Sequence, residues 1–428
     1  MSSKYVRRHL VEGLLRALES SRVVQLTGPR QAGKSTLVKM LDARVEVVTL
    51  DDDVARLSLQ SDGYGQLKRM RRRAAARGVP VVVDEIQRLP ELSLAIKRIV
   101  DEDPAPGQFL LTGSADILTS GATTDSLAGR VVPLRLLPFS AAEVRRRGPC
   151  RIFDLVESSP DAFLTALPDL EPVNRDEVLD LLYRGGFPEM RETRESSRAE
   201  RFEAYTDTLV ERDAAQLYAL RRPDELRRLV MQCAVRSGQE LRVTDLCGAL
   251  GVQRDTMLRW LELLERLSLF QRVGAWTGAA AGREVKAPKL HFLDSGLGMA
   301  LRGEDPRTFD LTARPQALGP VLESWVFAEL MKAVPMARRR WRPWHWRADR
   351  REVDMVWSGP SERLFLAEVQ ASSTLRESDA AHLRWFMTDG PGRQHECCAV
   401  IFYLGSTAFA LAPRVYALPL SVFWAWED

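Results

Sequence analysis

The stretch "LTGPRQAGKSTLVKML", Leu26 to Leu41, places two glycines, a lysine and a serine between an apolar run and a run with helical spacing. Four of its residues match the pattern GxxxxGKS/T: Gly28, Gly33, Lys34 and Ser35. In this pattern the glycines let backbone N–H groups surround phosphate oxygens, and the following helix adds a favourable dipole. The stretch therefore predicts a phosphate-binding loop made of Gly28, Pro29, Arg30, Gln31, Ala32, Gly33, Lys34, Ser35 and Thr36.

A phosphate loop of this kind needs a second ligand for Mg²⁺. We expect Lys34 to reach the β- and γ-phosphates and the Ser35 hydroxyl to join the Mg²⁺ shell. Two apolar runs end in acids, "VVTLDDD" at 51–53 and "VVVDE" at Asp84 and Glu85. We favour the second run, with Asp84 holding Mg²⁺ through water and Glu85 polarising the attacking water. The triplet 51–53 is interpreted as a strand end and turn with solvated charges.

Three later residues have candidate roles at the same site. "FLLTGSAD" carries Thr112 and Ser114, whose hydroxyls either sense the γ-phosphate or are simply hydrogen-bonded at a strand end. "DSLAGRVV" contains Arg130, which is either a surface residue or an arginine that stabilises transition-state charge, in cis or from a neighbouring subunit. These residue types alone leave both alternatives open.

The spacing of apolar runs predicts an α/β fold for this part of the chain. Five β-rich runs begin at Val23, Val45, Val79, Gln108 and Val131. Segments with helical spacing separate most of them, which favours a parallel sheet covered on both faces. In chain order, one run lies between the strand before the phosphate loop and the strand that ends in Asp84. This order is typical of ATPases that have an inserted strand and a catalytic glutamate.

Helical patterns dominate downstream, and one of them has capping and turn residues at the spacing of a helix-turn-helix. In "VTDLCGALGVQRDTMLRWLELLERLSLF", Thr244 is placed to cap one helix, Gly251 to end it, and Asp255 or Thr256 to begin the next. The second helix, 254–266, carries Arg254 and Arg259, which are suited to contacts with DNA. Its apolar run "WLELLERL" suits a structural or protein-docking role equally well, and both interpretations stay open.

The charge balance restricts how the protein would bind nucleic acid. The chain has 428 residues and a net charge of +3, so affinity must come from local basic stretches at 68–77 and 338–351. The second stretch includes Trp341, Trp344 and Trp346, which either stack on bases or, as we prefer, pack one face of a strand. A hydrophobic content of 45% excludes global disorder.

Cysteine usage and apolar runs predict a cytoplasmic protein. The five cysteines are scattered and form no CxxC or Cys/His metal spacing, which favours a reducing compartment. The N-terminal segment lacks the apolar core and cleavage site of a signal peptide. The apolar run from Ala399 is interrupted by glycine, prolines and Arg414, so it predicts strands and no membrane partner.

Taken together, "GPRQAGKST", "VVVDEIQRLPEL", "FLLTGSA" and "SLAGRVVPLRLLPFS" resemble the prokaryotic AAA+-type ATPases that carry a C-terminal domain of unknown function. The resemblance continues in order through "YRGGFPE", "KAPKLHFLDSGL", "LESWVFAEL" and "EVDMVW…LAEVQAS" and covers nearly the whole chain. It implies binding of ATP and Mg²⁺. By position, Lys34 and Ser35 fall in the phosphate loop, and Asp84 and Glu85 fall in the Walker B motif. Thr112 falls at the sensor strand and Arg130 in the "LAGR" element.

The same resemblance implies four domains. They are an AAA+-like P-loop NTPase domain at 1–148, a helical lid or linker at 149–223, a winged helix-turn-helix domain at 224–290, and a PD-(D/E)XK, restriction-endonuclease-like α/β domain at 291–428. In the last domain, carboxylates at Glu323, Asp354 and Glu368 are of the type that holds a divalent metal.

The motif of this last domain departs from the family pattern at one position. The pattern ends in a lysine, and here Gln370 stands in its place, which lacks the cation that would assist cleavage. We therefore predict a vestigial site with poor or no cleavage, unless Arg347, Arg350, Arg351 or Lys332 supplies the charge.

The leading hypothesis is a Mg²⁺-dependent ATPase that binds ATP and ADP and acts as a nucleotide-driven switch or remodeller on DNA. DNA would bind through the winged helix or the Arg/Trp stretch, and the protein would work as a homo-oligomer. One alternative is an ATP-regulated nuclease of a defence or repair system. The other is a slow-turnover ATP-binding scaffold for protein interactions.

Overall fold

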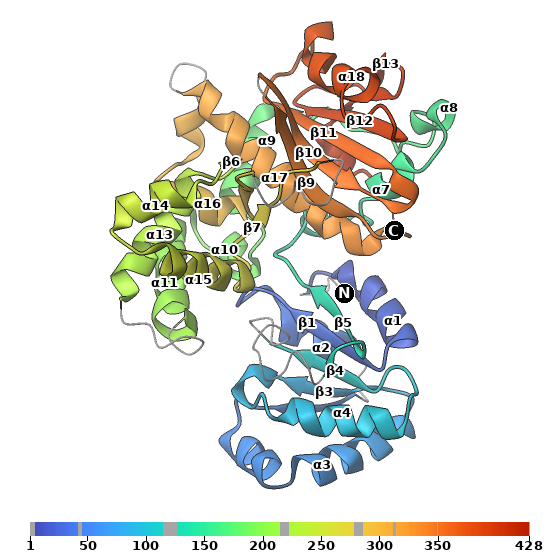
Figure 1. Ribbon diagram of the computed structural model, residues 1–428, viewed down its shortest axis with the longest axis vertical. Coiled ribbons are helices and arrows are strands. Elements are labelled where there is room, and N and C mark those ends of the chain that lie inside the picture. The colour runs from blue at the N-terminus through green and yellow to red at the C-terminus, as the bar shows by residue number, and fades with distance from the viewer. Residues whose placement is uncertain are drawn as a thin grey trace. The chain divides into compact units, whose positions relative to one another are not determined.

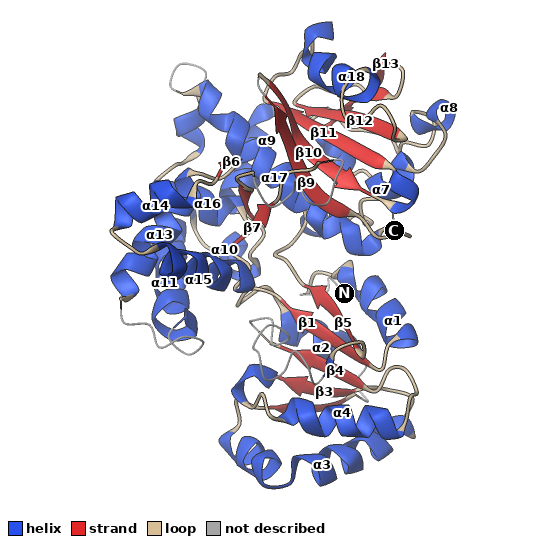
Figure 2. Ribbon diagram, in the orientation of Figure 1, coloured by secondary structure: helices blue, strands red, loops and turns tan. Residues whose placement is uncertain are grey.

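The computed structural model describes residues 5–41, 45–113, 127–214, 222–277, 286–310, 314–348 and 350–427. The chain divides into two compact units. The N-terminal unit contains residues 8–138 together with 266–268, and the second unit contains 139–265 and 269–428. The N-terminal unit contains a five-stranded sheet, and the second unit contains a six-stranded and a three-stranded sheet (Figures 1 and 2).

The N-terminal unit is built on a five-stranded sheet of order β2-β3-β4-β1-β5. All neighbouring strands are parallel. The strands are β1 (Val23–Thr27), β2 (Glu46–Thr49), β3 (Val81–Asp84), β4 (Phe109–Thr112) and β5 (Val131–Arg135). The five predicted runs are thus confirmed as strands of one parallel sheet. In space, β4 is the inserted strand, because it lies between β1 and β3 and pairs with both.

Helices cover both faces of this sheet, as the sequence predicts. The helices are α1 (Leu10–Ser20), α2 (Lys34–Leu41), α3 (Asp53–Ala75), the short η1 (Ile86–Arg88) and α4 (Leu92–Glu102). Leu67 of α3 and Ile96 of α4 join Phe109 of β4 in one buried cluster. Val24 and Leu110, which point to the other face of their strands, are also fully buried, so apolar side chains are covered on both sides.

The second unit begins with short helices. They are α6 (Ala141–Arg145), α7 (Ile152–Val156), α8 (Pro160–Phe163), α9 (Arg175–Arg184), α10 (Pro188–Glu192), α11 (Glu195–Thr208) and the π-helical η3 (Leu209–Ala214). The end of α9 is fixed by α16 (Ser295–Arg302). The buried Asp294 carboxylate caps α16 by accepting from the Leu297 N–H and also accepts from the Gly186 N–H, at 2.8 and 2.7 Å. A Cβ at Gly185 would lie 2.4 Å from this carboxylate, so "YRGG" and "FLDSG" are packing partners.

A helical module with a small sheet follows, called here the three-helix module (residues 223–292). Its chain order is α13 (Pro223–Val235), β6 (Gln239–Glu240), α14 (Val243–Leu250), α15 (Arg254–Arg266), β7 (Phe270–Val273) and β8 (Lys289–Phe292), and its antiparallel sheet has the order β6-β8-β7. Gly251 ends α14 in the left-handed conformation, as predicted. The prediction that Thr244 caps this helix is wrong, because the helix begins at Val243 and Thr244 already lies in its first turn.

The C-terminal part of the second unit forms a mixed six-stranded sheet of order β13-β14-β12-β11-β10-β9. The central pairs β11/β12 and β12/β14 are parallel and the other pairs are antiparallel. The strands are β9 (Arg342–Ala348), β10 (Arg351–Ser358), β11 (Leu364–Gln370), β12 (Cys397–Tyr403), β13 (Phe409–Ala412) and β14 (Val415–Pro419). The apolar run from Ala399 therefore forms strands, as expected from its glycine and prolines.

Two helices pack on this sheet. α17 (Leu318–Ala333) is buried along most of its length, and α18 (Ala381–Thr388) buries Leu383 and Phe386 in the sheet core. Short 3₁₀ turns complete the unit: η5 (Pro306–Phe309), η6 (Pro315–Ala317), η7 (Val334–Met336), η8 (Pro360–Glu362), η9 (Glu377–Ala380) and η10 (Leu420–Phe423). On β9, Trp346 is buried in the sheet core and Trp344 packs against it, as the strand interpretation of the Arg/Trp stretch expects, whereas Trp341 is buried just before the strand and packs on Phe153.

Two further sequence features can be checked against the structure. All five cysteines are free thiols, and four of them are buried. Among the described residues, no helix combines the length and the apolar character needed to cross a bilayer.

Candidate active site

The phosphate loop joins the end of β1 to the start of α2 at the carboxyl edge of the sheet. Gly28 adopts φ 148° and passes so close to the next strand segment that a Cβ would lie 2.1 Å from the Leu136 carbonyl oxygen. Gly33, just before α2, adopts φ 98°. Both positions require glycine, because an L side chain there is strained or clashes. The loop backbone is thus shaped before any ligand binds.

Two cations hold the loop. The buried Lys34 ammonium donates to the carbonyls of Gly28 and Pro29 at 2.8 and 2.9 Å. The buried Arg8 guanidinium donates to the carbonyls of Ala32 and Leu137, each at 2.5 Å. Sequence reasoning missed Arg8, because it precedes the motif by about a whole helix and belongs to no recognisable pattern. Of the remaining predicted loop residues, Arg30 is half-buried, whereas Gln31, Ser35 and Thr36 are exposed.

Three neighbouring strands bring the predicted metal and sensor residues together. The Ser35 hydroxyl lies 3.4 Å from the Asp84 carboxylate at the end of β3. The other Asp84 oxygen accepts a hydrogen bond from the fully buried Thr112 hydroxyl at the end of β4. A hydroxyl and a carboxylate are the hard oxygen ligands that Mg²⁺ takes in phosphate sites, so these residues fit the ion. Ser114, the second predicted sensor hydroxyl, lies outside the described residues.

Glu85 directly follows the Asp84 strand in an unusual backbone conformation. Its φ of 56° and ψ of 41° are left-handed, which is uncommon for a residue other than glycine and is frequent at functional sites. Its carboxylate accepts a hydrogen bond from the Gln87 amide. Burial raises the pKa of Glu85, Lys34 offsets part of this effect, and the Asp84 charge raises the pKa further. A carboxyl with a raised pKa is better suited to take a proton from water than an ordinary glutamate.

The acidic triplet at 51–53 has the structural role that the sequence predicts. Asp52 caps α3 by accepting from the Val54 N–H at 2.9 Å. Asp51 pairs with Arg88 at 2.6 Å, and all three side chains are exposed.

Arg130 lies at the end of the strands opposite to the phosphate loop. It directly precedes β5, and the register pairs Val23 with Val131 and Thr27 with Arg135, so the phosphate loop follows the opposite end of β1. Its guanidinium forms a two-pronged pair with Asp101 at 2.5 and 3.0 Å. This pair holds the pKa of Asp101 below its ordinary value. Within one copy of the chain, Arg130 is therefore separated from the phosphate loop by the length of a strand.

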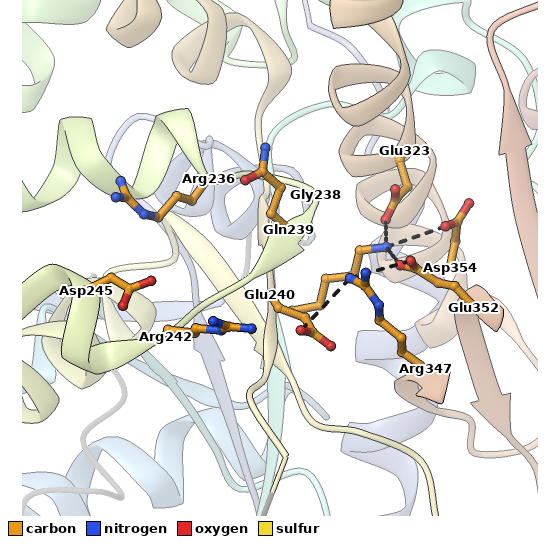
Figure 3. Close-up of a pocket in the computed structure, with 11 residues that line it drawn as sticks. Arg236, Gly238, Gln239, Glu240, Arg242, Asp245, Glu323, Arg347, Glu352 and Asp354 are labelled. Carbon is orange, nitrogen blue, oxygen red and sulfur yellow. Dashed lines mark hydrogen bonds and ion pairs between the residues drawn. The ribbon is translucent and has the colours of Figure 1, made fainter. Parts of the chain in front are cut away.

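In the second unit, the predicted nuclease-like carboxylates surround a lysine. The Lys289 ammonium, from β8, lies 2.6 Å from Glu323 on α17, 3.0 Å from Glu352 and 3.5 Å from Asp354, both on β10. Figure 3 shows the three carboxylates pointing toward one another from their two elements. We call Lys289, Glu323, Glu352 and Asp354 the lysine-carboxylate cluster. Sequence reasoning missed Lys289 and Glu352, because Lys289 lies in "KAPKLHF", far from the carboxylate motif.

Burial governs the charges in this cluster. It raises the pKa of Glu323 to about 8, with a further contribution from Asp354, against the opposing effect of Lys289. Burial likewise raises the pKa of Asp354. Although burial opposes its charge, the three carboxylates keep the pKa of Lys289 above the ordinary value. The lysine is therefore charged at neutral pH and is the counter-ion of the cluster.

The other predicted residues of this region lie around the cluster or away from it. Glu368 is buried on β11, and burial together with Asp354 raises its pKa well above the ordinary value. Gln370 ends β11 and is half-buried. Of the cations proposed to replace the missing lysine, Arg347 lies 3.8 Å from Glu352. Arg351 stacks on the Trp385 ring at 4.1 Å, and Arg350 is exposed. Lys332 pairs with Glu329 at 2.8 Å.

A cavity of about 500 Å³ opens over the cluster. Its walls come from the three-helix module and the C-terminal sheet, and Figure 3 shows charged side chains on both (Arg236, Glu240, Arg242, Asp245 and Arg347). Within the described residues, no group of three or more histidines, cysteines or carboxylates is placed to hold a metal ion. Two of the carboxylates predicted to hold a metal, Glu323 and Asp354, thus converge together with Glu352, but Lys289 lies between them.

The candidate DNA-reading helix α15 has two distinct faces. Its buried face consists of Met257, Trp260, Leu261, Leu263 and Leu264. Arg254 and Arg259 are exposed, and Arg259 donates to the Asp255 carbonyl and the Thr256 hydroxyl of its own helix, at 3.2 and 3.3 Å. The apolar run "WLELLERL" is therefore core, and both arginines are on the solvent side.

Comparisons with known proteins agree with the N-terminal site. Residues 20–145 match an AAA domain, residues 175–308 match a domain of unknown function (DUF8612), and residues 318–423 match another (DUF4143). The AAA match and the geometry at Lys34 and Asp84 identify the N-terminal unit as a P-loop ATPase domain.

Two relatives that match nearly the whole chain are described as uncharacterized proteins. The chain is 30% identical over 422 residues to uncharacterized protein Rv2008c of Mycobacterium tuberculosis, with 96% of this chain and 83% of that protein covered. It has the same identity and coverage with uncharacterized protein Mb2031c of Mycobacterium bovis. Among solved structures, it is similar to the Walker-type ATPase PABY2304 of Pyrococcus abyssi, at 14% identity and a TM-score of 0.43. That alignment covers 68% of this chain and 94% of the other.

Proposed function

Because the chain belongs to the same family as these two uncharacterized mycobacterial proteins and carries an AAA domain, we propose that it is a Mg²⁺-dependent ATPase acting as a nucleotide-driven switch or remodeller on DNA. One observation carries the proposal of hydrolysis. Residues from three adjacent strands meet at one edge of the sheet: Ser35 after β1, Thr112 on β4, and Asp84 on β3 with Glu85 after it.

Each residue has a distinct task in this proposal. The phosphate loop and Lys34 bind the β- and γ-phosphates. Ser35 and Asp84 would hold Mg²⁺, which neutralises charge on the phosphate oxygens when it is bound. Lys34 exchanges its hydrogen bonds to the Gly28 and Pro29 carbonyls for bonds to phosphate oxygens. The lysine is thus held at the loop before nucleotide arrives.

Glu85 is assigned to the attacking water. Its raised pKa and its position after Asp84 are those of a general base that takes a proton as water attacks. Thr112 keeps the Asp84 carboxylate oriented through its hydrogen bond, and this contact links the sensor strand to the metal ligand. Arg130 is assigned to the site of a neighbouring copy, because it is remote from the phosphate loop of its own chain.

The DNA association rests on the three-helix module. We interpret this module as a winged helix with α15 as the recognition helix, and its order of helices and strands supports that interpretation. Arg254 and Arg259 are exposed on that helix and are suited to phosphate or base contacts. In this proposal, ATP turnover in the N-terminal unit changes how the three-helix module holds DNA.

The decisive experiment is the ATPase rate of the purified full chain with Mg²⁺, with and without single- and double-stranded DNA. The proposal expects Mg²⁺-dependent turnover that DNA stimulates. Turnover without DNA stimulation would remove the DNA part and leave the ATPase. Tight ATP binding with negligible turnover under all conditions would instead favour a scaffold that ATP merely stabilises.

A further inference from the structure

The lysine-carboxylate cluster occupies the place where the resemblance to nucleases implies a divalent metal. Its three carboxylates come from α17 and β10 of the C-terminal sheet domain, whereas Lys289 comes from β8 of the three-helix module. The residues of the cluster are thus shared between two parts of the chain that are distinct in sequence. The cation of the cluster does not belong to the domain that supplies the anions.

The geometry of the cluster fits an ammonium better than a metal. The carboxylate oxygens lie 2.6, 3.0 and 3.5 Å from the Lys289 nitrogen, which is the range of charge-assisted hydrogen bonds and ion pairs. Mg²⁺ requires oxygens at about 2.0–2.1 Å in near-octahedral geometry. The second Asp354 oxygen also accepts from the Val369 N–H at 3.2 Å, which fixes that carboxylate in its present orientation. The present spacing of these oxygens around the nitrogen therefore suits an ammonium, and coordination of Mg²⁺ would require the oxygens to move closer together.

Charge balance also favours the lysine. The side chain of Lys289 is only 3% exposed, so its positive charge needs a partner inside the protein. Removing the ammonium would leave three carboxylates together in a partly buried site, which is costly unless a proton or another cation replaces it. The same lysine thus neutralises the acids and excludes a metal from the space between them.

We propose that Lys289 is the resident cation of this cluster, so that the native protein holds no divalent metal there, and that the cluster accepts a divalent metal only when the lysine is removed. The cluster then acts as an internal ionic tie between the three-helix module and the C-terminal sheet domain. This proposal concerns the second unit and does not depend on ATP hydrolysis.

The test uses Mn²⁺ as a probe, followed by electron paramagnetic resonance on the nucleotide-free full chain. The proteins are the native chain, Lys289→Met, the control Lys286→Met, and Asp354→Asn in both the native and the Lys289→Met background. Lys286 is a suitable control because it lies three residues earlier, is exposed, and donates to the Arg347 carbonyl at 2.9 Å. Methionine removes the charge and keeps much of the side-chain length.

We expect that the native chain and Lys286→Met bind no Mn²⁺ at the cluster. Asp354→Asn should therefore leave the Mn²⁺ binding of the native chain unchanged. Lys289→Met should bind one Mn²⁺ per chain, and adding Asp354→Asn should weaken this binding about tenfold or more. Mn²⁺ should also raise the melting temperature of Lys289→Met and leave that of the native chain unchanged.

Two outcomes would overturn the proposal. Mn²⁺ binding by the native chain that disappears in Asp354→Asn would show that the lysine does not exclude the metal. A folded Lys289→Met protein whose Mn²⁺ binding and melting temperature match those of the native chain would show that the acids form no latent metal site. If Lys289→Met does not fold, the comparison between the native chain and Asp354→Asn still decides whether metal binds beside the lysine.

Discussion

The Ser35 hydroxyl lies 3.4 Å from the Asp84 carboxylate, although 49 positions separate the two residues in the chain. The contact exists because β1 and β3 end at the same edge of a parallel sheet, with β4 between them. It unites the phosphate loop with the acidic strand end in one site, and it makes the roles of the neighbouring Lys34 and Glu85 testable one at a time.

Glu85→Gln should preserve ATP binding and lower turnover by about 10²–10⁴-fold, because the amide cannot accept the proton of the attacking water. Lys34→Ala should weaken nucleotide binding itself. Steady-state ATPase assays together with fluorescent-nucleotide titration separate the two effects. Glu91→Gln, an exposed glutamate six residues further on, is the matched control and should behave like the native chain. An unchanged rate in Glu85→Gln would remove Glu85 from the catalytic step.

Arg130→Ala should lose ATPase activity, and mixing it with Lys34→Ala protein should restore part of that activity. If Arg130 serves the site of a neighbouring copy, a mixture with Lys34→Ala protein forms interfaces with one intact site, and the rate rises above that of either variant. Asp101→Asn is the control, because it removes the ion pair at 2.5 Å but keeps the arginine. Equal losses in Arg130→Ala and Asp101→Asn, with no rescue on mixing, would mean that the pair is purely structural.

Charge reversal on α15 should weaken DNA binding. Binding through several phosphates should fall by orders of magnitude between about 50 and 200 mM salt, and Arg254→Glu with Arg259→Glu should reduce both the affinity and its salt dependence. Arg201→Glu with Arg307→Glu makes the same change in net charge at exposed sites elsewhere. Fluorescence anisotropy of labelled DNA measures both pairs. Equal effects of the two pairs would mean that α15 has no special part in binding.

The native chain should cut plasmid DNA poorly or not at all in Mg²⁺ or Mn²⁺. Gln370 provides no charge, and Lys289 is engaged by three carboxylates, so this lysine would have to leave the cluster before it could stabilise charge on a cleaved phosphate. Agarose gels of plasmid incubated with native, Asp354→Ala and Gln370→Lys proteins measure this. Robust native cleavage that Asp354→Ala abolishes would contradict the prediction and favour the nuclease hypothesis.

The stability of the second unit should fall between about pH 4.5 and 8 through Glu323. Its pKa is raised to about 8 in the folded protein from an ordinary 4.5, so the folded state holds a proton that the unfolded chain releases in this window. A raised carboxyl pKa therefore makes the free energy of unfolding decrease as pH rises. Glu323→Gln removes the contribution of this carboxyl to the pH dependence, so the variant should gain stability relative to the native chain from pH 5 to pH 8.

Urea unfolding followed by tryptophan fluorescence can measure this difference. All ten tryptophans lie between residues 260 and 426, so the signal reports on the second unit alone. Glu377→Gln, an exposed carboxyl with 81% of its side chain accessible, is the control and should show no trend against the native chain. A native-minus-variant difference that does not change with pH would refute the raised pKa of Glu323.

The sequence by itself determined those features that depend on local chemistry. Apolar runs of strand length predict all five strands of the ATPase sheet, because burial on both faces demands continuous hydrophobic segments. The phosphate loop is equally local, since its glycines, lysine and serine are consecutive and only glycine tolerates φ 148° at Gly28. The turn at Gly251 and the strand packing of Trp344 and Trp346 follow from similar short-range rules.

Only the tertiary structure decided which distant charges meet. Arg8 supports the phosphate loop from before α1, and Arg130 lies across the sheet from the nucleotide site of its own chain. Lys289, rather than any of the arginines nearer to Asp354 in sequence, became the partner of the carboxylates. The sequence around a long charged side chain does not indicate its partner. The pair forms only when folding buries both groups and each is the counter-ion of the other.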